Sequence, residues 1–143
     1  MKARVKWAEN MTFIGESESG HGVIMDAAPA IGGRNLGCRP MELFLIGAGG
    51  CTSIDVVLFL KKNNQQVDDC VVEIEAERAE TAPQIFKKVH LHYVITGRNI
   101  EEKFVKTAIQ LSSTKYCSAT ITLAQTAEVT HDYEIVQTHQ ESL

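Results

Sequence analysis

The sequence predicts a single α+β domain over residues 1–143, with elements in the order βββ-α-ββ-αα-β and a sheet wrapping a central helix. Three observations support this fold class. Short segments with alternating apolar and polar residues come first, one long apolar segment follows, and two longer alternating segments come after it. There is no repeat, linker or low-complexity stretch that would divide the chain.

The first 26 residues predict a three-stranded antiparallel meander. Residues 3–7, 12–17 and 22–26 each alternate in the two-residue period of a strand. The stretch ESGHG between the second and third segments has the composition of a turn. Residues 27–39 are rich in glycine, so we expect one long loop after the meander.

A long helix is predicted to begin at Pro40 and to end near Leu60. Proline suits the first helical position, since its missing N–H would have no partner inside the helix. Both faces of this helix are apolar, which predicts burial nearly all round. Glu42, Asp55 and several glycines interrupt the apolar run, which favours a buried helix over a membrane span.

The second half of the chain predicts two paired strands, two helices and a last strand. The apolar and polar residues of both strands alternate with a period of two. Asn99 is a candidate cap for the first helix, with acids near its positive end. The expected elements are strands over 69–79 and 88–96, helices over 100–113 and 117–123, and a strand over 127–136.

Composition excludes some classes of function. The formal net charge is −4 and no basic run occurs, which argues against a nucleic-acid or anionic-membrane surface. The amino terminus lacks the apolar stretch of a secretory signal, and the chain has four cysteines. We therefore expect a cytoplasmic protein with reduced thiols, in which a disulfide would be transient and catalytic.

Cys51 and Cys117 are the cysteines whose surroundings suit reactivity. Small residues around Cys51, in GAGGC, leave room for a substrate, although a tightly packed helix crossing would explain them too. Cys117 begins a helix, where unpaired N–H groups favour a thiolate. Asp55 lies one turn beyond Cys51 on the same face and would oppose a thiolate unless a cation offsets it. Cys70 is expected to be a small half-buried packing residue, and Cys38 is not expected to have a functional role.

Two readings of these thiols stay open on the residues alone. Cys51 and Cys117 stand 66 residues apart, so a redox pair is one interpretation and core packing is the other. No CxxC motif is present, which argues against a thioredoxin-type site and the usual zinc knuckle. His90, His92 and His131 could form a metal site but are expected to be polar residues on an open sheet face. No metal and no bound cofactor is predicted.

The combination of GGRNLGCRPMELFLIGAGGCTSIDVV with the later KYCSAT resembles the OsmC/Ohr family of thiol peroxidases, particularly its YhfA-like branch. The resemblance covers essentially the whole chain. It implies α+β subunits in which antiparallel sheets wrap long central helices. It also implies an intertwined homodimer with two active sites at the interface.

The resemblance implies a specific chemistry. Cys51 matches the peroxidatic cysteine, which attacks an organic hydroperoxide and becomes a sulfenic acid while an alcohol leaves. Cys117 matches the resolving cysteine, which condenses with that sulfenic acid to a disulfide. A small dithiol or another cellular thiol then restores the pair. The implied role is defence against oxidative stress.

An arginine held by a glutamate favours the thiolate in the well-studied members of the family. Arg34 and Arg39 are the candidates here, with Arg34 the first choice. Glu42 is the candidate acid, but Met41 separates it from Pro40, and on a regular helix it lies half a turn from Cys51.

Two further departures from the family pattern are visible. Ser118 stands where the enzymes commonly have proline, and Cys38, in the loop, adds a third thiol near the expected pocket. The alternative function is a dimer that binds a small hydrophobic ligand or senses redox state without peroxidase turnover. A scaffold without chemistry is the third hypothesis.

Overall fold

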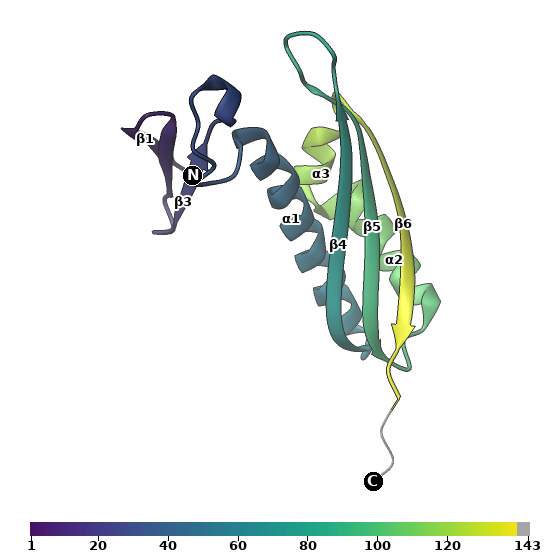
Figure 1. Cartoon of the computed structure of the whole chain (residues 1–143). Coiled ribbons are helices and arrows are strands. Elements are labelled where there is room, and N and C mark those ends of the chain that lie inside the picture. The colour runs from purple at the N-terminus through teal and green to yellow at the C-terminus, as the bar shows by residue number, and fades with distance from the viewer. Residues whose placement is uncertain (140–143) are drawn as a thin grey trace. The chain divides into compact units, whose positions relative to one another are not determined.

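The computed structural model describes residues 1–139, which fall into two compact units, Met1–Ile46 and Gly47–Leu143. The boundary lies inside the long helix, and each unit contains its own three-stranded sheet (Figure 1). The α+β class and the predicted order of elements are confirmed. A single domain over the whole chain stays a prediction.

The first unit is the predicted antiparallel meander. Strands β1 (Ala3–Glu9), β2 (Thr12–Ser17) and β3 (Gly22–Asp26) pair in that order. The loop that follows contains one 3₁₀ turn, η1 (Pro29–Ile31). Every residue of β1 is exposed, so this small sheet has a face without a cover within its own unit.

A buried carboxylate organises the loop after β3. Asp26 is 1% exposed and accepts hydrogen bonds from the backbone N–H groups of Ala27, Arg34 and Leu36, at 2.8, 3.2 and 3.1 Å. The hydroxyl of Thr12 is a fourth donor, at 3.2 Å. Burial would raise the pKa of Asp26, but these donors outweigh it and hold the pKa below its ordinary value. The ionised side chain thus satisfies the amides of a loop that has little regular structure.

Helix α1 (Pro40–Lys62) begins at Pro40 as predicted. The carboxylate of Glu42 reaches back to accept the backbone N–H of Arg39 at 2.8 Å, the acidic half of a capping box. The last turn carries Lys61 and Lys62, which complement the negative end of the helix dipole.

The prediction that α1 is buried nearly all round is wrong for the single chain. Its apolar window is only 28% buried. One face packs inward through Ala48, Gly49, Thr52, Val56 and Leu60. The other leaves large apolar side chains exposed, namely Phe44, Ile46, Ile54 and Leu58. By length and composition the helix could also cross a membrane, a test that core helices of soluble proteins pass as well.

The second unit is built on a sheet in the order β4-β5-β6. Strands β4 (Gln66–Arg78) and β5 (Phe86–Arg98) pair antiparallel, as predicted. Strand β6 (Glu128–Gln137) instead runs parallel to β5, so the expectation of purely antiparallel sheets is wrong for this strand. The intervening helices return the chain to the opposite end of the sheet, and a parallel neighbour needs such a crossover.

Three helical segments form that crossover: α2 (Glu102–Leu111), the π-helical turn η2 (Ser112–Tyr116) and α3 (Ser118–Leu123). Asn99 is not the cap of α2. It adopts a left-handed conformation with φ of 52°, and Glu101 takes the cap position. Asparagine tolerates this conformation better than most residues, so it turns the chain after β5 instead.

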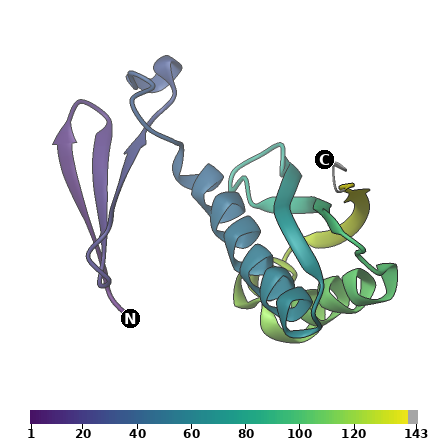
Figure 2. The same ribbon diagram turned by 90° about the horizontal axis from the view of Figure 1, so that it is seen from below.

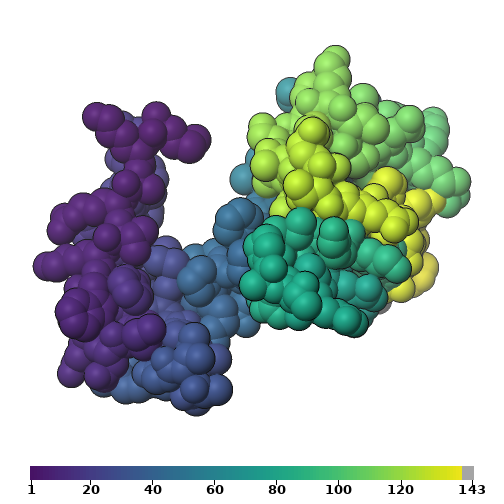
Figure 3. All heavy atoms as spheres, turned by 90° about the horizontal axis from the view of Figure 1, so that it is seen from above, coloured from purple at the N-terminus to yellow at the C-terminus, as the bar shows by residue number. Residues whose placement is uncertain are grey.

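The core of the second unit lies between the sheet and the helices, which cover one face of it (Figure 2). Its fully buried side chains come from α1, β5 and α2 and include Val56, Leu60, Leu91, Tyr93, Ile95, Val105 and Ile109. The space-filling view shows the teal, green and yellow segments of this unit in continuous contact (Figure 3). Its helices are therefore fixed to the sheet by apolar packing.

The other face of the sheet carries a histidine–aspartate group. Asp132 accepts hydrogen bonds from His90 and His92 at 2.9 and 2.7 Å, and His90 also bonds Thr130. The hydrogen bond to Asp132 raises the pKa of His92. His131 alternates to the opposite face beside α2. The expected place on the open sheet face is confirmed for His90 and His92 and is wrong for His131, and Asp132 is a partner that the sequence reasoning did not identify.

The Asp26 carboxylate gives the first unit a predictable response to acid. Because its pKa in the folded state lies below the ordinary value of 3.8, its stabilising effect is present above that pH. The effect is lost as the pH falls through the folded-state pKa. We expect Asp26→Asn to lower the melting temperature by a few degrees at neutral pH.

Thermal unfolding across a pH series measures this difference, which should shrink towards acid pH. Asp69→Asn, at an exposed position on β4, is the matched control and should change little. Equal melting temperatures for Asp26→Asn and the parent protein at neutral pH would contradict the assignment.

Candidate functional site

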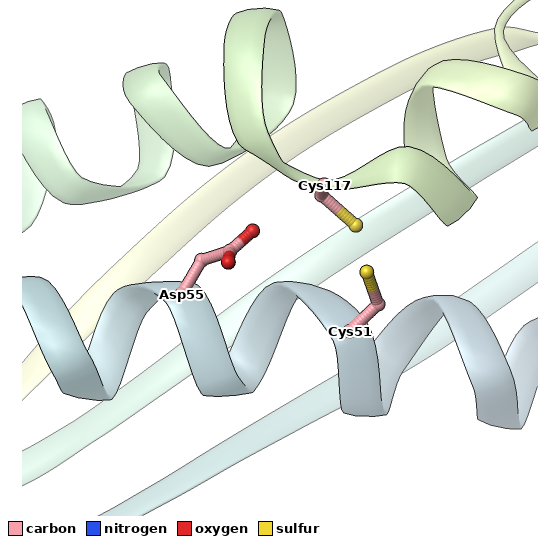
Figure 4. Close-up of side chains that lie close together, drawn as sticks. All are labelled: Cys51, Asp55 and Cys117. Carbon is pink, nitrogen blue, oxygen red and sulfur yellow. The ribbon is translucent and has the colours of Figure 1, made fainter.

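Cys51, Asp55 and Cys117 converge in the second unit. The two sulfurs and a carboxylate oxygen all lie within 4.8 Å of one another. Cys51 and Asp55 extend from successive turns of α1, and Cys117 meets them from the segment between η2 and α3 (Figure 4). We call this arrangement the thiol–carboxylate site. It joins two cysteines that the sequence leaves far apart.

The π-helical turn places Cys117 at this site. The N–H of Cys117 donates to the carbonyl of Ser112 at 2.9 Å, a bond that spans five residues instead of four. The chain then turns, and Cys117 becomes the N-cap of α3. Its sulfur accepts the N–H of Thr120 at 3.4 Å, so the predicted position at a helix start is confirmed.

The glycines near Cys51 have two different surroundings. A side-chain carbon on Gly49 would come within 2.8 Å of Ile74 on β4, so this glycine allows α1 to lie close to the sheet. Gly47 and Gly50 would meet no atom within 4 Å. Gly49 therefore allows close packing inside the unit, while Gly47 and Gly50 leave the outer face of α1 without side chains at their positions.

The two thiols differ in accessibility. Cys117 has no exposed surface, whereas Cys51 is half-buried. Burial raises the pKa of the Cys117 thiol; hydrogen bonding from Thr120 opposes this effect, and neighbouring Cys51 reinforces it. Cys117 is thus held as a neutral thiol, and Cys51 is the sulfur that a solvent-borne molecule can reach.

A row of hydroxyl groups fixes the direction of the Asp55 carboxylate. Tyr93 and Thr52 are joined at 2.8 Å, Thr52 and Ser112 at 2.8 Å, and Ser112 donates to Asp55 at 3.1 Å. Burial raises the pKa of Tyr93 to about 12, so its hydroxyl keeps its proton. Each hydroxyl has one proton to donate, and that of Ser112 is used on Asp55. Thr52 therefore donates to Ser112 and Tyr93 to Thr52, so that every donor in the row points towards the carboxylate.

A hollow of about 300 Å³ adjoins this carboxylate. Apolar side chains line most of it, and Lys62 and Asp55 supply its charged groups. The lining residues from α1 are Asp55, Leu58, Phe59 and Lys62, and those from α2 and η2 are Ala108, Leu111, Ser112 and Tyr116. A small, largely apolar molecule could occupy such a space.

The other two cysteines lie outside the thiol–carboxylate site. Cys70 is half-buried on β4 and packs against the core, and burial raises the pKa of its thiol. Cys38 is half-buried in the first unit, where its backbone bridges to Met25 of β3. Cys70 has the packing role expected for it.

The predicted arginines and their acid lie in the first unit, where their contacts are local. Arg34 pairs with Glu9 at 3.3 Å. The guanidinium of Arg39 donates to the carbonyl of Gly37 and to the side chain of Asn35, at 3.1 and 3.0 Å. The carboxylate of Glu42 bonds the backbone of Arg39 rather than a guanidinium. Their catalytic roles stay predictions.

With this geometry described, comparison with known proteins identifies the family. The model of the OsmC-like protein family matches residues 33–132, which include the end of the loop, all of α1 and Cys117. The chain belongs to the OsmC-like family.

Similar proteins and solved structures match almost the full length of the chain. Protein YhfA of Escherichia coli strain K12 is 45% identical over 139 residues, covering 95% of this chain and 98% of its own. A hypothetical protein from Aquifex aeolicus VF5 is 27% identical with a TM-score of 0.85, covering 96% of this chain and 97% of its own. An organic hydroperoxide resistance protein from Elizabethkingia anophelis is 20% identical with a TM-score of 0.66, covering 95% and 94%, and shows likeness of fold alone.

Sequence reasoning missed the hydroxyl row that orients Asp55 in this OsmC-like chain. A signal existed for Asp55 itself, four residues after Cys51 on one helix face. Thr52 was marked only by its position beside Cys51. Ser112 and Tyr93 carry no local signal, because their contacts with Thr52 span 60 and 41 residues.

Proposed function

We propose that this protein is a cysteine-dependent reductase of organic hydroperoxides that acts in defence against oxidative stress. The observation that carries the proposal is the convergence of the Cys51 and Cys117 sulfurs within 4.8 Å. Membership of the OsmC-like family, which includes proteins named for organic hydroperoxide resistance, supports a redox role. The hollow beside Asp55, lined mostly by apolar groups, suits a substrate with a hydrocarbon body.

Accessibility assigns the roles of the two thiols. Half-buried Cys51 attacks as a thiolate, breaks the O–O bond and takes the terminal oxygen, and the alkoxide leaves with a proton as an alcohol. Buried Cys117 then attacks the Cys51 sulfenic acid, forming the disulfide and releasing water. A small dithiol supplies two electrons and two protons to restore both thiols. Such recycling fits a reducing compartment such as the cytoplasm.

A cation is needed to favour the attacking thiolate. We propose Arg34 for this role, with Arg39 as the second candidate. Glu42 would act indirectly, because its bond to the backbone of Arg39 fixes the start of α1 and the end of the loop that bears both arginines.

We propose further that two copies of the chain form a homodimer through the exposed face of α1. This face presents Ile54 and Leu58, with 62% and 52% of their surfaces exposed, and the open sides of Gly47 and Gly50. An apolar surface of this extent marks a site of association. The occupant is a second copy, since the family's sheets are expected to wrap paired helices.

Removing the thiols tests the proposed reaction. We expect Cys51→Ser to reduce consumption of an alkyl hydroperoxide, with a dithiol donor, to the background rate. Cys117→Ser should still react once with peroxide but then accumulate over-oxidised Cys51, because no partner captures the sulfenic acid.

Peroxide consumption and intact-protein mass measure these outcomes. Cys70→Ser, which alters a half-buried cysteine outside the site, is the control and should retain activity. If Cys51→Ser consumed peroxide as fast as the parent protein, the proposed function would be wrong, and the ligand-binding or redox-sensing alternative would be favoured.

Alanine substitution tests the two arginines. If loss of the cation raises the pKa of the thiol by about one unit, the thiolate fraction falls about tenfold at a pH where the thiolate is the minor form. We therefore expect Arg34→Ala to slow alkylation of Cys51 by iodoacetamide about tenfold. Arg34→Lys should recover part of the rate.

Arg39→Ala should have a smaller effect on the alkylation rate. Arg78→Ala, on β4, is the control, since this arginine bonds a local carbonyl. Equal alkylation rates in Arg34→Ala and the parent protein would eliminate Arg34, and a tenfold loss in Arg39→Ala would transfer the role to Arg39.

Charge substitution on α1 tests the homodimer. Burying an aliphatic side chain contributes about 1.5 kcal/mol or more, and a twofold interface contains each residue twice. We expect Leu58→Glu to weaken dimerisation at least about hundredfold, measured by sedimentation equilibrium.

Val136→Glu is the matched control, because Val136 is 44% exposed but lies on β6. A parent protein that sediments as a monomer at all concentrations would refute the proposed dimer. So would a Leu58→Glu variant that dimerises with unchanged affinity.

A further inference from the structure

We propose that the reduced protein binds one divalent cation of the zinc type through Cys51, Cys117 and Asp55, with a fourth position open to water. This inference goes beyond the proposed function and does not require peroxidase turnover. It rests on the donor set and the convergence of its three atoms within 4.8 Å. Two sulfurs and a carboxylate oxygen are ligands that zinc accepts.

The spacing is compatible with tetrahedral coordination. Zinc–sulfur bonds of about 2.3 Å and tetrahedral angles place two ligating sulfurs about 3.8 Å apart. A zinc–oxygen bond of about 2.1 Å places sulfur and oxygen about 3.6 Å apart. Small rotations of three side chains suffice to reach these distances from a group already gathered within 4.8 Å.

Two ligands already have the outer hydrogen bonds typical of metal sites. The hydroxyl of Ser112 donates to one oxygen of Asp55 at 3.1 Å, which leaves the second oxygen for a cation. The N–H of Thr120 donates to the sulfur of Cys117 at 3.4 Å.

Charge also favours a cation. With both thiols deprotonated, the site would carry three negative charges, and within residues 47–139 no ion pair to Asp55 is formed. A divalent ion reduces the total to one. Binding to the dithiol form releases two protons to solvent, one from each sulfur.

Metal binding and disulfide formation exclude each other at this site. The disulfide brings the sulfurs to about 2.05 Å and removes both as thiolate ligands. A bound cation in turn occupies the sulfur that would attack a peroxide. The site would therefore hold the ion only while reduced and release it on oxidation.

Cadmium titration of the reduced, metal-free protein tests the inference without any peroxide. Cd²⁺ gives ultraviolet charge-transfer absorption when thiolates bind it, so the signal reports sulfur ligation alone. We expect saturation at one ion per chain, displacement by Zn²⁺ and release of protons. Asp55→Asn should weaken binding about 10–100-fold, and Cys51→Ser and Cys117→Ser should abolish the signal.

Three controls separate this site from others. Cys70→Ser tests a thiol outside it, and Asp132→Asn tests the His90–His92 group; both variants should titrate like the parent. The parent protein in its disulfide form should give no charge-transfer signal until it is reduced again. This control involves no substitution, so misfolding of a variant cannot explain its result.

Absence of charge-transfer absorption in the reduced parent protein overturns the inference. So does an unchanged signal in Cys51→Ser, or unchanged affinity in Asp55→Asn. A protein that consumes hydroperoxide but takes up no cadmium leaves the proposed function intact. One that binds cadmium but consumes no peroxide supports the metal site and contradicts the enzyme.

Discussion

The hydroxyl of Thr52 determines much of what the site can do, because it joins three elements at one buried point. It bonds Tyr93 of β5 and Ser112 of η2, each at 2.8 Å, and it is fully buried. A buried hydroxyl must keep its partners, because leaving one unsatisfied costs about 1–3 kcal/mol. This contact therefore sets the rotation of α1 and, with it, the direction in which neighbouring Cys51 and Asp55 point.

The same rotation explains why α1 has two unlike faces. With Thr52 facing the sheet, Ile54 and Leu58 face outward, since they lie about half a turn and about a third of a turn away around the helix. In the single chain, the helix orientation that presents Cys51 also leaves these two apolar side chains exposed. In the first unit, Val5 and Trp7 of β1 are also exposed, at 61% and 63%. Uncovered apolar surface of this extent marks a site of association, and the rotation that directs Cys51 also presents the α1 face of the proposed homodimer.

Local periodicity was enough to predict the elements, since alternation and apolar runs depend on neighbours in sequence. It failed where distant contacts decide: β6 runs parallel to β5, and Asn99 turns the chain instead of capping α2. The approach of Cys51 and Cys117 was an expectation from resemblance rather than from pattern. The turn that produces it is a single bond across five residues from Cys117 to Ser112, and nothing in SSTKY marks that bond locally.

The closeness of the sulfurs creates an electrostatic conflict that the burial of Cys117 resolves. Two thiolates and a carboxylate within 4.8 Å would repel strongly in a partly buried site. Burial raises the pKa of Cys117, which favours the neutral form of this thiol. The row of donors from Tyr93 ends on Asp55, so every hydroxyl in it points towards the carboxylate. In the proposed peroxide reduction a cation would favour the Cys51 thiolate, and in the proposed metal complex a divalent ion would offset the charge of all three groups. The proposed redox chemistry and the proposed metal site would therefore both draw on a cation at the same three groups.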